Sequence, residues 1–179
     1  MDTVTPFADL DHAARMEQLA RAGAIAVIAH AGQTDKLMVD YIKDPEAVAA
    51  SFDPTRQTLE HCAALLHDVI EDAAREGNLK TISSELLVKA GTHPEVVEIV
   101  ELLTRREGDG DAYYERIRAN PAARAVKLAD IGTTPTLIAP PPCRPRRGSG
   151  SRRSTSTRSR YWERADHASA SQPGKPRVA

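Results

Sequence analysis

The feature that most constrains this chain of 179 residues is an apolar stretch that surrounds a histidine–aspartate pair. The apolar positions of this stretch are Leu59, Cys62, Ala63, Leu65, Leu66, Val69 and Ile70. At helical spacing they cover almost the whole circumference of a helix, so other elements must surround it on all sides. The pattern therefore predicts a helix deep inside one domain, and the chain is long enough to build such a core.

The other apolar residues of the first three quarters of the chain also recur at helical spacing. Aromatic residues make up only 4% of the chain, and no stretch alternates apolar and polar residues as a half-buried strand would. The predicted fold class is therefore all-α, a bundle of about six or seven helices. Helices are expected over residues 11–30, 45–50, 54–74, 83–90, 94–103, 113–118 and 121–129. In the last of them, the residues expected to face the core are Ala125, Val126, Leu128 and Ala129.

The composition changes after Asp130. Residues 132–179 contain ten Lys and Arg against two Asp and Glu, a net charge of +8, and seven of the twelve prolines. Residues 1–131 carry the opposite net charge of -9, and the whole chain carries -1. The composition predicts a domain over residues 1–131 and a disordered basic tail over residues 132–179. The tail has no regularly spaced aromatic residues, so a solvated tail is expected rather than a nucleic-acid-binding module.

Membrane insertion and secretion are not expected from the sequence. No apolar run reaches the ~18 residues of a membrane span. Residues 1–10 contain two acidic residues and neither a basic start nor an apolar stretch, unlike a secretory signal. Cys62 and Cys143 form no disulfide framework, and Cys62 is expected to be a small buried apolar residue. The expected location is the cytoplasm.

Four ionisable residues interrupt the central apolar helix. His67 and Asp68 are adjacent, and Glu71 and Asp72 follow one turn later on the same face. Placing an imidazole and a carboxylate in an apolar helix is costly unless a partner compensates, and a divalent cation would do so. Singly, each residue has an ordinary explanation, since a His-Asp pair occurs by chance and Glu71–Asp72 fits a solvated helix end. Their combination points to a metal site.

Two further residues complete a possible ligand set. His30 lies at the end of the first apolar helix, and Asp130 at the end of the last one. Together with His67 and Asp68 they would supply two imidazoles and two carboxylates. Such a mixed nitrogen and oxygen site suits Mn²⁺ or another divalent cation and leaves room for water.

The same residues lie in segments whose order and spacing are specific. The segments are HAGQTDK (30–36), Tyr41-Ile42, Pro45 with Val48-Ala49, AALLHDVIED (63–72), Leu103-Thr104, Asn120-Pro121 and VKLAD (126–130). Over residues 15–131 the chain resembles the hydrolase domain of RelA/SpoT-type alarmone enzymes, within the HD phosphohydrolase superfamily. It is similar above all to the small stand-alone HD proteins related to that domain.

The resemblance implies a helical HD fold and one Mn²⁺ bound by His30, His67, Asp68 and Asp130. It further implies that Glu71 and Asp72 act beside the metal in catalysis, and that the enzyme removes pyrophosphate from the 3′ position of ppGpp. Lys36 and Lys127 are candidate phosphate-binding residues, with ordinary solvated lysines as the alternative. The expected partner is a ppGpp-like nucleotide. The alternatives are an HD hydrolase of another nucleotide and a catalytically impaired nucleotide-binding domain.

One local departure from the family pattern follows Tyr41-Ile42. The family has His-Pro where this chain has Asp44-Pro45. That histidine is not among the metal ligands that the resemblance implies here. The exchange is therefore expected to affect loop geometry more than metal binding.

A larger departure begins at Gly132. The family continues there with a His-Asn pair, Thr-Asp-Pro and a last helix, which this chain lacks. Permissible codons for residues 132–139, read with one nucleotide lost, give Gly-His-Asn-Thr-Asp-Pro-Asp-Arg, which restores the family pattern. Our hypothesis is that residues from about 132 onward are a frameshift product, which leaves the HD domain without its last helix. Resequencing the locus tests it, and an intact frame in the source DNA would reject it.

Overall fold

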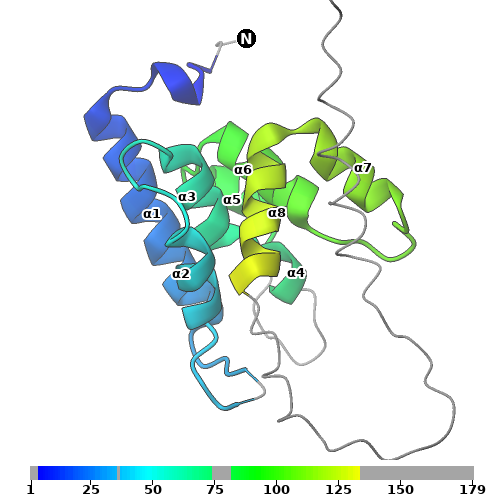
Figure 1. The fold of residues 1–179 in the computed structure, drawn as a ribbon. Helices are drawn as coiled ribbons and strands as arrows, with labels where there is room; N and C mark the ends of the chain where they lie inside the picture. The colour runs from blue at the N-terminus through cyan, green and yellow to red at the C-terminus, as the bar shows by residue number, and fades with distance from the viewer. Residues whose placement is uncertain (1–3, 36, 74–81, 134–179) are drawn as a thin grey trace, which may run out of the picture. The chain divides into compact units, whose positions relative to one another are not determined.

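The computed structural model describes residues 4–35, 37–73 and 82–133, and these residues form an all-α fold (Figure 1). The predicted fold class is thereby confirmed. The elements are a short 3-10 helix at Phe7–Asp9 and the helices α1 (His12–His30), α2 (Lys43–Ala49), α3 (Thr58–Leu66), α4 (Val69–Ala73), α5 (Ser84–Lys89), α6 (Pro94–Leu103), α7 (Ala112–Ala119) and α8 (Pro121–Thr133). The chain divides into two units, Met1–Ile138 and Ala139–Ala179, and all described residues belong to the first. The predicted disordered tail therefore lies, from residue 134 on, outside the described residues.

Helix α3 is the centre of the bundle, as its apolar pattern predicted. It packs against α1, α2, α6 and α8, and Figure 1 shows it between α1 and α8. Cys62, Ala63, Ala64 and Leu66 have no exposed surface. Burial raises the pKa of the Cys62 thiol to about 12, so Cys62 is the buried apolar residue that the sequence predicted.

The predicted helix over residues 54–74 is broken into parts. Asp53 accepts backbone hydrogen bonds from Thr55 at 2.9 Å and Arg56 at 3.0 Å, which holds that segment in a turn, and α3 begins only at Thr58. At its other end α3 stops at Leu66, and α4 begins at Val69. His67 and Asp68 occupy the junction. Counted as one interrupted helix, α3 and α4 bring the number of α-helices among the described residues to seven.

Helices α5 and α6 lie within the predicted ranges 83–90 and 94–103, and local signals set their ends. The Ser83 hydroxyl caps α5 by accepting a hydrogen bond from the Leu86 backbone, and Pro94 occupies the first turn of α6. Gly91 follows α5 with a φ of 83°, a left-handed conformation that favours glycine. A Cβ at this position would lie 2.6 Å from Nη1 of Arg21, so the turn is closely covered by α1.

The inward face of α8 differs from the prediction. Ala123, Val126 and Lys127 are buried, whereas Leu128 is 41% exposed. The buried positions recur at three and four residues and form the face that packs against α2, α3, α6 and α7. Leu128 lies off that face. Its predicted burial was wrong because the helical period, and not the hydrophobicity of a residue, sets which side chains of α8 face the core.

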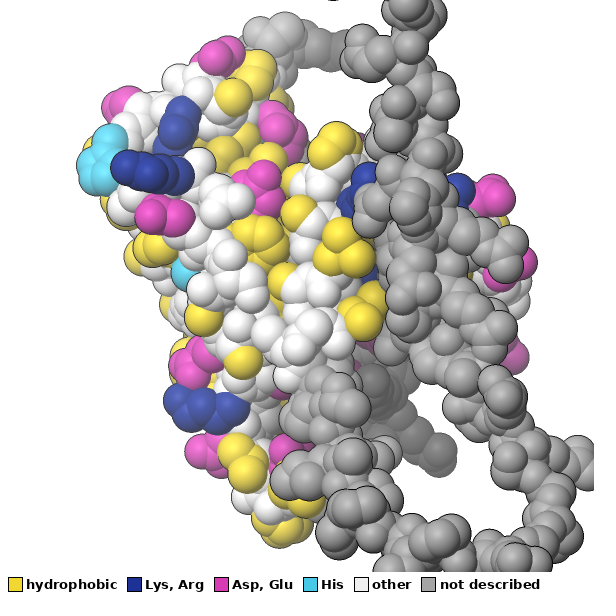
Figure 2. All heavy atoms as spheres, viewed as in Figure 1, with side chains coloured by type: hydrophobic (Ala, Val, Ile, Leu, Met, Phe, Trp, Pro, Cys, Tyr) yellow, Lys and Arg dark blue, Asp and Glu magenta, His cyan; other side chains and the backbone are white. Residues whose placement is uncertain are grey.

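The surface of the described residues carries mixed charges. Figure 2 shows acidic and basic side chains interspersed on one face, around apolar side chains near its middle. No helix in the described part of the chain is both long and apolar enough to cross a membrane.

Candidate metal centre

The candidate site lies where α2, the α3–α4 junction and α8 meet. Asp44 from α2, His67 from the junction and Asp130 from α8 each bring one potential ligand atom within 4.8 Å of the others. These helices belong to packed pairs, since α2 contacts both α3 and α8, and α3 contacts α8. Three segments distant in sequence are thus joined by the core itself, which gives the site a rigid frame.

His67 is the most deeply buried member of the group, with 2% of its surface exposed. Its Nδ1–H donates a hydrogen bond to the Ala64 carbonyl oxygen at 2.8 Å, which fixes the orientation of the ring. The other nitrogen, Nε2, is buried and has no hydrogen-bond partner, although it lies 3.2 Å from Oδ1 of Asp68. Histidines that bind a metal usually donate a hydrogen bond from one ring nitrogen and coordinate the metal with the other, and His67 has this arrangement, with Nδ1 bonded and Nε2 without a partner.

Asp68 is fixed by a neighbouring loop. The Tyr41 hydroxyl donates a hydrogen bond to Oδ2 of Asp68 at 3.0 Å. Burial would raise the pKa of the Asp68 carboxyl, but His67, Tyr41 and the charge of Lys127 outweigh it and hold this pKa well below its usual range. Asp68 is therefore an anion with a fixed direction beside the imidazole.

The surrounding carboxylates make the site strongly favourable for a cation. Burial alone would lower the pKa of His67, but the adjacent carboxylate of Asp68, the charge of Asp130 and the hydrogen bond to Ala64 raise it to about 9. Burial also raises the pKa of Asp44, and the charges of Asp68 and Asp130 add to that rise. The neighbouring carboxylates are thus the main cause of the raised pKa of His67, whereas burial is the main cause of the raised pKa of Asp44, which the charge of His67 partly offsets.

Asp130 is oriented by a lysine one turn before it. Nζ of Lys127 lies 2.5 Å from Oδ2 of Asp130, and it also lies 5.8 Å from the centre of the Tyr113 ring. Lys127 is only 6% exposed. Lys127 is therefore not an ordinary solvated lysine, and its ammonium group forms an ion pair with Asp130. Whether it also binds phosphate stays a prediction.

His30 lies beside the group rather than within it. Its Nδ1 pairs with Oε1 of Gln33 at 2.9 Å and is 3.9 Å from Oδ2 of Asp72. Its ring packs against Tyr41, with 5.0 Å between the ring centres. Its Nε2 is buried without a hydrogen-bond partner. The group of ligand atoms within 4.8 Å does not include His30, so its role as a ligand stays a prediction.

The two predicted catalytic carboxylates lie on α4, directly after the junction. Glu71 is partly exposed, and its Oε2 accepts a hydrogen bond from the Arg105 backbone at 3.2 Å. Asp72 is only 4% exposed and lies near His30. The structure thus brings His30, His67, Asp68, Glu71 and Asp72 into one region of the domain. Lys36, the other predicted phosphate contact, lies outside the described residues.

Asp44 is the site residue that the sequence analysis missed. The exchange at this position was expected to affect loop geometry more than metal binding, but the carboxylate lies with His67 and Asp130. The sequence carried a signal, because the resemblance implies a histidine at this position, and imidazole and carboxylate side chains can both bind metals. Only the packing of α2 against α3 and α8 shows what the residue faces.

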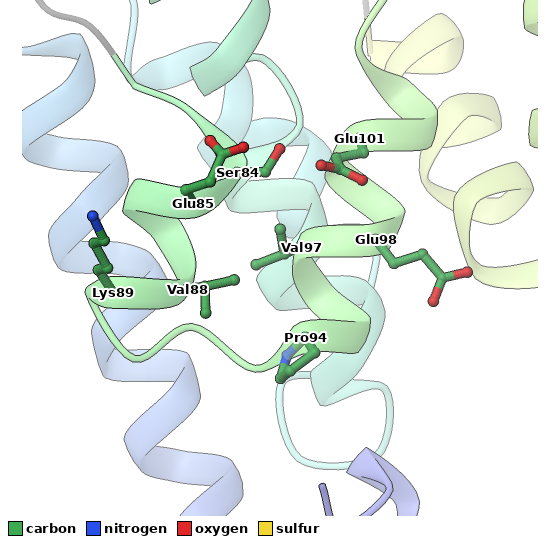
Figure 3. A pocket seen from close by; sticks show the side chains of 8 residues that line it. All are labelled: Ser84, Glu85, Val88, Lys89, Pro94, Val97, Glu98 and Glu101. Carbon is green, nitrogen blue, oxygen red and sulfur yellow. The ribbon is translucent and has the colours of Figure 1, made fainter. Parts of the chain in front are cut away.

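A separate hollow of about 470 Å³ lies between α5 and α6 (Figure 3). Val88 and Val97 face each other across it, and Glu85, Glu98 and Glu101 lie around its rim. A single lysine, Lys89, accompanies these three glutamates. The acidic rim would repel a phosphorylated ligand, so this hollow is a poor candidate for a nucleotide site.

Comparisons with known proteins assign no family. No protein-family model matches the chain, and no curated protein matches it either. A functional assignment must therefore rest on the sequence pattern and on the geometry of the candidate site.

Proposed function

We propose that the protein is a metal-dependent phosphohydrolase of the HD type, acting as a 3′-pyrophosphohydrolase on ppGpp or a closely similar nucleotide. The observation that carries the proposal is the buried Nε2 of His67, which has no hydrogen-bond partner and lies among the carboxylates of Asp44, Asp68 and Asp130. A buried polar atom without a partner calls for an explanation, and coordination of a divalent cation provides one.

The donor set fits a divalent cation such as Mn²⁺. The ligand atoms of His67 and Asp130 lie within 4.8 Å of one another, and Asp68 is directly beside His67. Imidazole and carboxylate ligands suit Mn²⁺ and similar ions. When bound, such an ion lowers the pKa of a coordinated water and neutralises phosphate oxygens.

The protein residues around this set have distinct tasks. Tyr41 holds Asp68 and Lys127 holds Asp130, so that both carboxylates keep their direction. Glu71 is the group best placed for proton transfer to and from solvent, since it is partly exposed on the helix that follows the junction. Asp72 faces His30 and is suited to orient that ring.

The experiment that tests the function is the release of pyrophosphate from ppGpp by the purified chain with Mn²⁺. The matched control is His67→Ala, because it removes the atom on which the proposal rests. Release that requires Mn²⁺ and disappears in His67→Ala supports the assignment. Release that persists unchanged in His67→Ala would reject it.

A chain that binds Mn²⁺ but releases no pyrophosphate would leave the two alternatives drawn from the sequence. A panel of other phosphorylated nucleotides tests for a different substrate. Restoring the family-like reading frame from residue 132 and repeating the ppGpp assay tests for an impaired enzyme. Activity that appears only in the restored chain would identify the altered C-terminal segment as the cause.

A further inference from the structure

Asp44 differs from Asp68 and Asp130 in how its carboxylate is held. Lys127 holds Asp130, and Tyr41 holds Asp68. Within the part of the chain that the structure describes, no hydrogen bond or ion pair engages the Asp44 side chain. A half-buried carboxylate without a partner is costly, and a cation shared with His67 and Asp130 would compensate for it.

The position of Asp44 is fixed by the helix that carries it. Asp44 lies in the first turn of α2, and the next residue, Pro45, is buried. Helix α2 packs against α3, which ends directly before His67, and against α8, which carries Asp130. The backbone of Asp44 is also held, since its N–H donates to the Tyr41 carbonyl oxygen at 3.0 Å. The carboxylate is thus presented to the other two ligand atoms by a rigid frame.

We infer that Asp44 is a ligand of the bound cation and that it shifts the metal preference of the site toward the harder cations Mn²⁺ and Mg²⁺ relative to Zn²⁺. The inference rests on the metal-dependent function proposed above and specifies its metal. The group that lies within 4.8 Å contains one imidazole and two carboxylates. Carboxylate oxygens suit Mg²⁺ and Mn²⁺, whereas each added imidazole favours Zn²⁺ and other borderline ions.

The test is isothermal titration calorimetry of the full chain with MnCl₂, MgCl₂ and ZnCl₂. Asp44→Asn removes the charged ligand, and we expect its affinity for Mn²⁺ to fall about tenfold or more. The matched control is Asp40→Asn, which makes the same change of charge four residues earlier at an exposed position. Its affinity for Mn²⁺ should stay within about twofold, since surface charges are largely screened.

The second variant, Asp44→His, tests for a change in metal preference rather than a loss of metal affinity. An added imidazole should shift the ratio of Zn²⁺ to Mn²⁺ affinity toward Zn²⁺ by about tenfold or more. This variant keeps a ligand at the position, so it tests the inference even if Asp44→Asn fails to fold. Circular dichroism reports the folding of each variant.

The outcomes separate this inference from the proposed function. Unchanged Mn²⁺ affinity in folded Asp44→Asn, or an unchanged metal preference in Asp44→His, overturns the inference and leaves the hydrolase proposal standing. Mn²⁺ binding that depends on Asp44, without hydrolysis of any nucleotide, supports the inference and counts against the hydrolase. A wild-type chain that binds none of the three ions overturns both.

Discussion

Two buried histidines of this protein both lie next to helix ends but differ in their hydrogen bonding. His93 precedes α6 in the turn after α5, and His67 follows α3 at the junction with α4. Nδ1 of His93 accepts a hydrogen bond from the Glu95 backbone at 3.2 Å, and its Nε2–H donates to the Thr5 carbonyl oxygen at 3.0 Å. Nε2 of His67 has no such partner.

The difference separates a histidine used by the fold from one available to a ligand. His93 also packs its ring edge-on against Phe7, with 5.2 Å between the ring centres, so every polar atom and the ring face have structural contacts. His67 has only its Nδ1 engaged, and carboxylates rather than apolar groups surround the other nitrogen. Burial alone does not distinguish the two residues. The number of ring nitrogens with a hydrogen-bond partner distinguishes them.

The largest expected effect is the loss of metal affinity in His67→Ala. Removing a residue that merely orients a ligand costs roughly 10- to 100-fold in affinity, so removing a ligand should cost about 100-fold or more. Calorimetric titration with Mn²⁺ measures it. His93→Ala serves as the control and should bind Mn²⁺ within about twofold of wild type. Equal losses in both variants would erase the distinction between the two histidines.

The second prediction concerns the contribution of His93 to stability. His93→Ala should lower the free energy of unfolding by about 1–2 kcal/mol, because it removes the side chain that caps α6. Urea unfolding followed by circular dichroism gives the value. His93→Asn is the conservative variant, since it keeps an acceptor for the Glu95 N–H, and it should recover part of the loss. A His93→Ala chain as stable as wild type would contradict a structural role.

A smaller effect is expected from Gly91→Ala, two residues before His93. The left-handed φ of 83° disfavours a side chain, and the new Cβ would also displace the Arg21 side chain. The expected cost is about 1 kcal/mol. Thermal unfolding measures it, with Gly23→Ala in α1 as the control, because a Cβ there meets no atom within 4 Å. A gain of stability in Gly91→Ala would show that the turn adjusts freely.

The smallest effect is expected away from both histidines, at the ion pair of Asp109 and Arg116. Nη2 of Arg116 lies 2.6 Å from Oδ2 of Asp109, and this contact, with the Arg106 backbone N–H, lowers the pKa of the Asp109 carboxyl. A lowered acid pKa contributes stability that is present above the ordinary value of 3.8 and is lost as the pH falls below it. Asp109→Asn should therefore lower Tm slightly at pH 7, by a few degrees (~2).

The pH dependence checks the cause of that shift. The difference in Tm between wild type and Asp109→Asn should shrink as the pH is lowered from 5 toward 2. Scanning calorimetry at both ends of this range gives the comparison. A difference that grows on acidification would show that the carboxylate is not stabilised by Arg116.

Local sequence signals anticipated most of the secondary structure. Ser83, Gly91 and Pro94 mark helix ends because a cap, a left-handed turn and a fixed φ are properties of single residues and their neighbours. The break at residues 67–68 was not anticipated, because apolar residues continue through it to Val69 and Ile70. The burial of Lys127 was missed as well, since its partners Asp130 and Tyr113 are brought to it by packing between helices.

The candidate site was partly anticipated in the same way. His67, Asp68, Glu71 and Asp72 were proposed from their own spacing, which a helix translates directly into proximity. Asp130 was proposed from its place at the end of the last predicted helix, and the structure brings one of its carboxylate oxygens within 4.8 Å of the ligand atom of His67. Asp44 could not be placed, because nothing in its local sequence states which helix α2 will pack against.

By itself, the sequence determined an all-α fold around one apolar helix and the presence of ionisable residues within that helix. The reason is that helical periodicity and capping act over a few neighbouring residues. Tertiary structure alone decided which nitrogen of His67 lacks a hydrogen-bond partner and that Asp44 brings a carboxylate oxygen within 4.8 Å of the ligand atoms of His67 and Asp130. These facts depend on contacts between segments distant in sequence, which form only when the helices pack.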